Sequence, residues 1–156
     1  MAERDKLLAG MVVEVGYLWK EEADQGHDRA LKRRPCLIVE AVAEPDGVRV
    51  GIVPLTHNPP TNRFTQEIPA SYLKQAGLDG QGCSVVLNEM NRFKWPNGDP
   101  DFKLVVRGTL PSGYFGQLRD VVSAQSYGQR ISIVDRDEIQ RAIVEAYREQ
   151  DMEHEP

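Results

Sequence analysis

The stretch that decides the fold is KRRPCLIVEAVAEPDGVRVGIVPLT, residues 32–56. It contains an apolar segment at 36–43, a turn at Pro45-Asp46-Gly47 and a second apolar segment at 48–55. Proline presets φ in a tight turn and glycine accepts a positive φ, so this order of residues predicts a β-hairpin.

Two side chains with groups suited to binding or catalysis flank this hairpin. Arg34 stands just before the first predicted strand, and Thr56 stands at the end of the second. The far end of one hairpin strand lies near the start of the other. We therefore expect Arg34 and Thr56 to meet at one end of the sheet.

The remaining chain adds short strands first and helices later. Proline residues precede two predicted helices, after Pro69 and after Pro111, and Asp135 with Glu138 forms a capping box before a third. Further strands are predicted at 11–19, 64–68, 83–89, 102–107 and 130–134, with loops at 20–32 and 90–101, the latter with an Asn97-Gly98 turn. This order predicts a mainly β fold with helices (α+β), as a strongly bent antiparallel sheet or partly open barrel.

Length and composition indicate one globular domain. The chain has 156 residues, of which 40% are hydrophobic and 28% charged. It lacks any apolar run near the roughly 20 residues that cross a bilayer, and its first ten residues lack the apolar region of a secretory signal. We expect a cytoplasmic protein without a membrane partner. Cys36 and Cys83 lie in apolar segments and are expected to be reduced core residues, and the scattered histidines favour no metal site and no cofactor.

The net negative charge of the chain comes from its C-terminal segment. Residues 135–156 hold eight acidic and three basic residues, which accounts for the whole net charge of −5. Residues 1–134 are then neutral and free to carry a local basic face. We divide the chain into a body, 1–134, and an acidic helix with a frayed tail, 135–156, which is an extension rather than a second domain.

Four segments resemble the MazF/PemK (Kid) family of toxin endoribonucleases. The hairpin string RRPCLIVEAV…VGIVPLT is similar to that family's Arg-Pro strand and its later Pro-x-Thr, and GHDRALKRRP resembles its Gly-His-Glu segment. CSVVLNEMNRF is similar to a later strand in which an acid precedes an arginine by three positions, and TLPSGYFGQLRDVV occupies the place of a C-terminal helix. The resemblance covers roughly residues 9–126.

The resemblance implies a fold, an activity and partners. The fold would be a small SH3-like β-barrel of the MazF/PemK/CcdB type, here with a C-terminal helical extension. The protein would act as a homodimer that cleaves single-stranded RNA without metal, leaving 2′,3′-cyclic phosphate and 5′-hydroxyl ends. A cognate antitoxin protein would neutralise it. Two alternatives are a gyrase poison similar to CcdB and an inactive barrel that serves as a binding module.

Four residues are candidates for catalysis. Arg34 supplies a guanidinium, which binds phosphate in a bidentate manner, although Arg33 beside it is a competing choice. Thr56 would hydrogen-bond the phosphate or the 2′-hydroxyl. His27 titrates near neutrality and would act as acid or base. Glu89 matches an acidic position that the family uses in RNA binding or catalysis; otherwise it is a charge at a strand end.

A second group of side chains is expected to bind RNA, because basic side chains and aromatic stacking hold single strands. Phe93 and Trp95 are open to a second interpretation, in which they cap the core. The acidic extension could also cover the basic groove in cis; otherwise it is a solvated helix. The predicted RNA-binding residues are Arg33, His57, Asn58, Arg63, Arg92 and Trp95.

Overall fold

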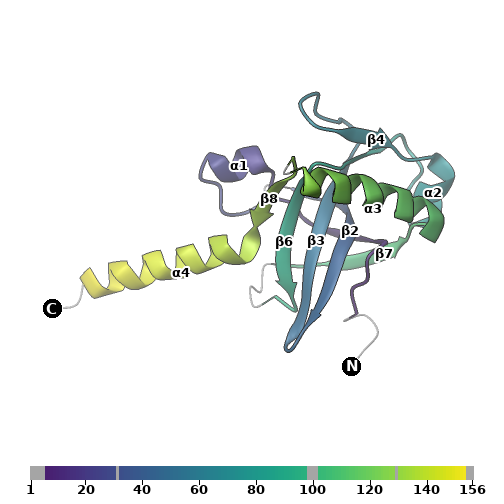
Figure 1. The fold of residues 1–156 in the computed structure, drawn as a ribbon. Coiled ribbons are helices and arrows are strands. Elements are labelled where there is room, and N and C mark those ends of the chain that lie inside the picture. Colours follow the sequence, from purple (N-terminus) through teal and green to yellow (C-terminus); the bar gives the residue numbers. More distant parts are fainter. Residues whose placement is uncertain (1–5, 31, 98–101, 129, 154–156) are drawn as a thin grey trace.

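A computed structural model describes residues 6–30, 32–97, 102–128 and 130–153. Strands dominate its first two thirds and two long helices its last third (Figure 1). The elements are β1 (Met11–Gly16), α1 (Lys20–Asp24), β2 (Arg33–Glu44), β3 (Gly47–Thr56), β4 (Thr65–Glu67), α2 (Ala70–Gln75), β5 (Ser84–Val86), β6 (Glu89–Trp95), β7 (Val105–Thr109), α3 (Ser112–Tyr127), β8 (Ser132–Asp135) and α4 (Arg136–Glu153).

The eight strands form one open sheet. Its main path runs β4-β5-β3-β2-β1-β7, and β6 branches from β3 and pairs with β8. The β6–β8 pair is parallel and the others are antiparallel. Within the described residues the terminal strands β4 and β7 do not pair, so the sheet does not close. The α+β class is confirmed. None of the described helices has the length and apolarity needed to span a membrane.

The predicted hairpin is the longest pairing of the sheet. Strands β2 and β3 run antiparallel from Cys36 opposite Pro54 to Glu44 opposite Gly47, with an irregularity between Ile38 and Glu40. Gly47 has φ +155°, and a Cβ there would lie 2.3 Å from the Trp95 carbonyl oxygen. Glycine is therefore required at the turn both by conformation and by the close approach of β6.

Both faces of the hairpin are buried, which explains its unbroken apolar run. Leu37 belongs to a core with residues of α2 and α3, such as Leu73 and Leu118. Ile38 points to the opposite core, which contains Phe93. Alternate side chains of a strand face opposite sides, so CLIV must be apolar throughout.

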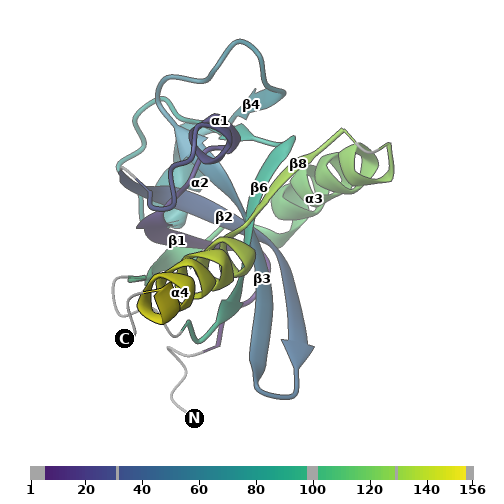
Figure 2. The same ribbon diagram turned by 90° about the vertical axis from the view of Figure 1, so that its left-hand side faces the viewer.

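Helix α4 leaves the body and projects away from it (Figures 1 and 2). The expected cap is present, since the Glu138 N–H donates to Asp135 Oδ1 at 3.0 Å. Its first turn is anchored to the sheet: Arg136 donates to the Gly16 carbonyl at 2.9 Å, and Asp137 accepts from the Lys94 N–H at 2.8 Å. Residues 154–156 of the predicted tail lie outside the described residues.

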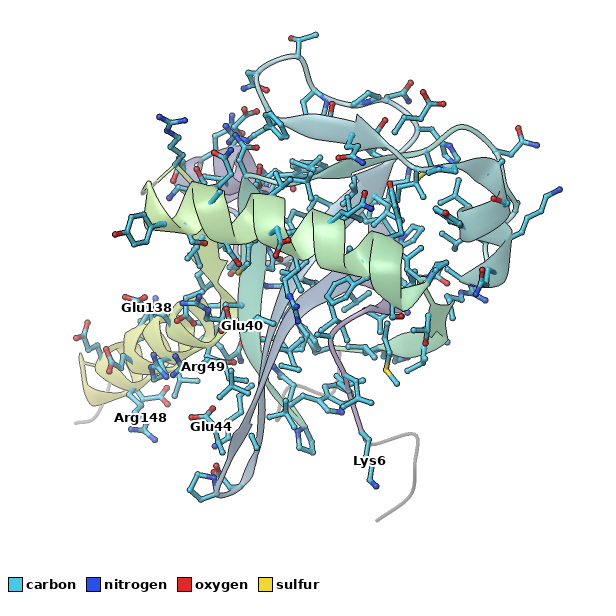
Figure 3. The ribbon with its side chains drawn as sticks, turned by 45° about the vertical axis from the view of Figure 1, so that its right-hand side comes forward. Lys6, Glu40, Glu44, Arg49, Glu138 and Arg148 are labelled. Carbon is cyan, nitrogen blue, oxygen red and sulfur yellow. The ribbon has the colours of Figure 1, made fainter. Side chains whose placement is uncertain are left out.

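Charged side chains lie on the β2–β3 hairpin and on α4. Figure 3 shows Glu40, Glu44 and Arg49 on the β2–β3 hairpin, and Glu138 and Arg148 on α4. Arg49 pairs with Glu44 at 3.8 Å, and the two side chains are 53% and 32% exposed.

Three sequence predictions of local structure are wrong. The loop at 20–32 contains helix α1, the single strand at 83–89 is two strands, β5 and β6, and the loop at 90–101 contains most of β6. The strand at 102–107 begins later, at Val105, because Phe102 packs on Phe93 with ring centroids 4.7 Å apart. Gly98 of the predicted turn lies outside the described residues. The strand expected at 130–134 is β8, which begins at Ser132.

Asn91 explains why β6 does not look like a strand in the sequence. Its side chain occupies an inward position with no exposed surface, where a strand normally places an apolar residue. Its Oδ1 accepts the Leu18 N–H at 2.9 Å, and its Nδ2 donates to the Leu18 carbonyl at 2.7 Å. A polar residue is therefore the correct one for this inward position.

We predict that Asn91→Ala lowers the free energy of unfolding by about 2–4 kcal/mol, because both buried polar groups of Leu18 lose their partner. Urea denaturation measures the change. Asn62→Ala is the matched control: it removes an exposed hydrogen bond to Glu21, and we expect a change within about 0.5 kcal/mol. Equal losses in the two variants would contradict the assignment.

Candidate functional site

A cleft of about 400 Å³ lies at one end of the hairpin. Its walls come from the β1–β2 connection, the starts of β2 and β6, the end of β3 and the β3–β4 connection. The lining residues are Trp19, Glu21, Glu22, Lys32, Arg34, Thr56, Asn58, Pro60, Asn62, Arg63 and Glu89.

Arg34 and Thr56 line this same cleft, as the hairpin predicted. The β2–β3 register sets Cys36 opposite Pro54, and two further residues along each strand lead to these two positions. The Thr56 hydroxyl accepts the Asn58 N–H at 3.1 Å. This turn brings Asn58 into the cleft beside Thr56.

Arg33 points elsewhere, which separates the two adjacent arginines. Its guanidinium donates to the carbonyl oxygens of Lys103, at 2.8 Å, and Glu14, at 3.0 Å. Successive side chains of a strand face opposite sides. Of the pair, only Arg34 lines the cleft.

The Arg34 guanidinium has no hydrogen bond or ion pair to any residue that the structure describes. Its Nε is buried and unsatisfied. The carbon of the guanidinium lies over the Trp19 ring, 5.1 Å from its centroid. A cation held in a cleft without a polar partner is available to an anionic ligand.

Glu89 forms the floor of the cleft with Arg63. Its side chain is 1% exposed, and Oε2 lies 2.9 Å from Arg63 Nε, whose side chain is 17% exposed. Oε1 accepts the Lys20 N–H at 2.6 Å. Both oxygens therefore have donors, and the carboxylate fixes Arg63 and the start of α1.

Tyr17 lies behind this ion pair. Its hydroxyl is buried and makes no hydrogen bond of normal geometry. Burial raises the pKa of Tyr17, and the adjacent negative charge of Glu89 raises this pKa further. Tyr17 therefore stays neutral behind the ion pair and does not line the cleft.

Helix α1 forms the outer edge of the cleft. The Trp19 N–H donates to Glu22 Oε1 at 3.0 Å, which starts the helix. Asn62, from the β3–β4 connection, donates to Glu21 Oε1 at 2.8 Å. This bridge joins the two connections that flank the cleft.

The other predicted site residues lie outside this cleft. His27 is exposed on the connection after α1, where its N–H donates to the Glu22 carbonyl at 3.0 Å. His57 lines a separate hollow of about 300 Å³ and its Nδ1 lies 2.6 Å from the Gly82 carbonyl oxygen. Arg92 pairs with Glu40 at 3.3 Å; Figure 3 shows Glu40 on the hairpin.

The two aromatic candidates take the core position that was their second interpretation. Phe93 has no exposed surface and belongs to the core around Tyr17 and Ile38. Trp95 is half-buried and packs against the same core. Both cysteines are free and buried, as predicted.

The cleft carries three basic and three acidic side chains. Arg63 and Glu89 neutralise each other, which leaves Lys32 and Arg34 against Glu21 and Glu22. The basic side chains come from the start of β2 and the acidic ones from α1. Among the described residues, no group of three or more His, Cys, Asp or Glu side chains is placed to hold a metal ion.

Sequence reasoning missed Trp19, Lys32, Glu21, Glu22 and Asn62. They lie in segments without periodicity, where position follows from tertiary contacts. The signal that was present is Trp19 itself: a tryptophan that ends the alternation of 11–19 and starts a charged loop.

Comparison of the chain with protein-family models, with curated proteins and with solved structures found no match. The function is therefore inferred from the residues of the cleft and from the sequence resemblance.

We predict that Arg63→Met lowers the free energy of unfolding by about 3 kcal/mol, because it leaves the buried Glu89 carboxylate without its cation. Urea denaturation measures the change.

Arg49→Met is the control, because the Arg49–Glu44 pair is much more exposed than the Arg63–Glu89 pair and its loss should cost under about 1 kcal/mol. Equal losses in Arg63→Met and Arg49→Met would contradict the role given to Glu89.

Proposed function

We propose that this protein is a metal-independent endoribonuclease that binds single-stranded RNA in the cleft between α1 and the end of the β2–β3 hairpin. The observation that supports it is Arg34: an arginine in a cleft, beside Thr56 and Asn58, whose guanidinium forms no ion pair with any residue that the structure describes. A phosphodiester supplies the missing anion. The resemblance of the hairpin to the MazF/PemK family supports RNA as its source.

The proposed reaction is transfer of the phosphoryl group to the adjacent 2′-hydroxyl. The 2′-hydroxyl loses its proton to a base, and its oxygen bonds to phosphorus. The bond from phosphorus to the 5′ oxygen breaks, and an acid supplies a proton to that oxygen. The products are a 2′,3′-cyclic phosphate and a 5′-hydroxyl.

We assign each of these tasks to different residues. Arg34 stabilises the charge that develops on the phosphoryl oxygens, and Thr56 with Asn58 orients the phosphate. Glu22 lines the cleft and is the proposed base. His27 lies on the same connection but outside the cleft, so water is the proposed source of the proton for the 5′ oxygen. Glu89 acts through Arg63, since both of its oxygens are occupied.

A second candidate is a binding module that holds RNA without cleaving it. Two observations favour it: Glu89 has no free carboxylate oxygen, and the His27 ring does not line the cleft. Binding without cleavage requires the cation and the hydroxyl but no proton transfer.

The remaining proposals follow from the resemblance. The open sheet would be a variant of the small SH3-like barrel of the MazF/PemK/CcdB type. The protein would form a homodimer in the cytoplasm, and a cognate antitoxin would neutralise it by covering the cleft. Helix α4 contributes no lining residue to this cleft and projects away from the body (Figure 2), so we do not assign it the covering role.

We predict that Arg34→Ala reduces cleavage of a long single-stranded RNA in EDTA by about 100-fold or more, because a transition-state charge loses its donor. Gel electrophoresis measures the cleavage, and direct labelling by a polynucleotide kinase detects the new 5′-hydroxyl ends.

Arg33→Gln is the matched control, since the adjacent arginine lies outside the cleft; it should cleave within about 3-fold of the unchanged protein. Coincident urea unfolding curves would show that both variants fold. Equal activity in Arg34→Ala would overturn the site. Binding by the unchanged protein without cleavage would establish the binding module, and neither binding nor cleavage would overturn the RNA proposal.

A further inference from the structure

The orientation of Arg34 needs an explanation, because the usual constraints on a guanidinium are missing. Within the described residues, no carboxylate or carbonyl accepts from it, and its Nε is buried without a partner. An arginine side chain has large rotamer freedom. The contact that remains is the Trp19 ring, at 5.1 Å from the guanidinium carbon to the ring centroid.

Trp19 is itself held rigidly. The residue before it, Leu18, has both backbone groups paired with Asn91. The Trp19 N–H donates to Glu22 Oε1 at 3.0 Å. The Tyr17 ring meets the indole edge-on, with centroids 5.3 Å apart and planes at 75°. The backbone at Trp19 and one edge of its indole are therefore held by contacts that require no ligand.

A guanidinium over an aromatic face keeps its hydrogen-bonding capacity. Its five N–H groups lie in the guanidinium plane, so an aromatic ring against the face does not take up their hydrogen bonds. In Arg34 the Nε is buried, and the Nη groups are the donors left for a ligand. A carboxylate partner would instead occupy two of those donors and cancel the charge. Aromatic support is thus a way to orient the cation while leaving it able to bind an anion.

The other arginine–aromatic contacts lack this combination. Arg136 lies over Phe102 at 5.1 Å, but its Nη1 also donates to Gly16 and Asn91. Arg119 lies over Phe115 on α3. Of these three pairs, Trp19 and Arg34 are the pair of which both members line the cleft.

We propose that Trp19 is a positioning residue, whose indole holds the Arg34 guanidinium ready for a phosphate group. The inference rests on the proposed function only in taking that phosphate to belong to RNA. It assigns Trp19 no contact with the reacting atoms.

The first test uses a fluorescein-labelled oligodeoxynucleotide, which lacks the 2′-hydroxyl and is not cleaved. Trp19→Leu removes the aromatic face and should weaken binding about 3- to 30-fold in fluorescence anisotropy. Trp19→Phe keeps an aromatic face and should bind within about 3-fold of the unchanged protein. In an Arg34→Ala background, Trp19→Leu should have no further effect, because the two residues act together.

The second test monitors the fluorescence of Trp19. In a Trp95→Phe background Trp19 is the only tryptophan, and titration with inorganic phosphate should change its fluorescence in a saturable way. The change should vanish when Arg34→Ala is added. Urea unfolding of each variant identifies any loss that comes from misfolding.

The outcomes separate the two proposals. A phosphate-dependent fluorescence change, together with neither binding of the oligodeoxynucleotide nor binding or cleavage of RNA, would support the role of Trp19 and refute RNA as the ligand. Undiminished affinity in Trp19→Leu, or an equal loss with and without Arg34, would overturn the positioning role. So would the absence of any fluorescence response to phosphate.

Discussion

The candidate site depends on one buried interaction, the pairing of the Asn91 side chain with both backbone groups of Leu18. Leu18 follows the end of β1, where no neighbouring strand can satisfy its N–H and carbonyl. Asn91 supplies both partners from β6, and Arg136 adds a donor to Asn91 Oδ1 at 3.2 Å. Buried polar groups are expensive unless paired, so this arrangement fixes the chain that enters α1. The positions of Trp19 and of α1 at the edge of the cleft depend on this arrangement.

Two arginines one residue apart illustrate how the same side chain acquires different uses. Arg33 finds two backbone carbonyls across the sheet edge, and its charge serves the structure. Arg34 faces the other side, and its guanidinium lies over the Trp19 ring. Arg63, in turn, is neutralised by Glu89. The cleft therefore contains a buried ion pair, Arg63–Glu89, and an arginine, Arg34, that pairs with no carboxylate among the described residues.

Part of this site is predictable from the sequence because the hairpin is. The apolar run, the Pro-Asp-Gly turn and period-2 alternation place Arg34 and Thr56 at one end of one pairing, and the register leads to that result. The position of Asn58 in the cleft follows from that of Thr56, because the two residues are close in the sequence. The spacing of His57 and Arg92 to the hairpin did not reveal that both lie outside this cleft. The strand prediction failed for β6, where Asn91 replaces an apolar residue and interrupts the pattern.

The sequence by itself determined the α+β class, the hairpin, the caps of the late helices and the burial of both cysteines. These features arise from local turn chemistry and from periodicity, which act between neighbours in the chain. Only the tertiary structure decided that Glu89 is occupied by Arg63 and Lys20, that Trp19 supports Arg34, and that α4 projects. Each of these depends on contacts between residues that are distant in sequence, as in the 73 positions between Leu18 and Asn91. Such contacts are set by the packing of the whole sheet, and no local pattern encodes them.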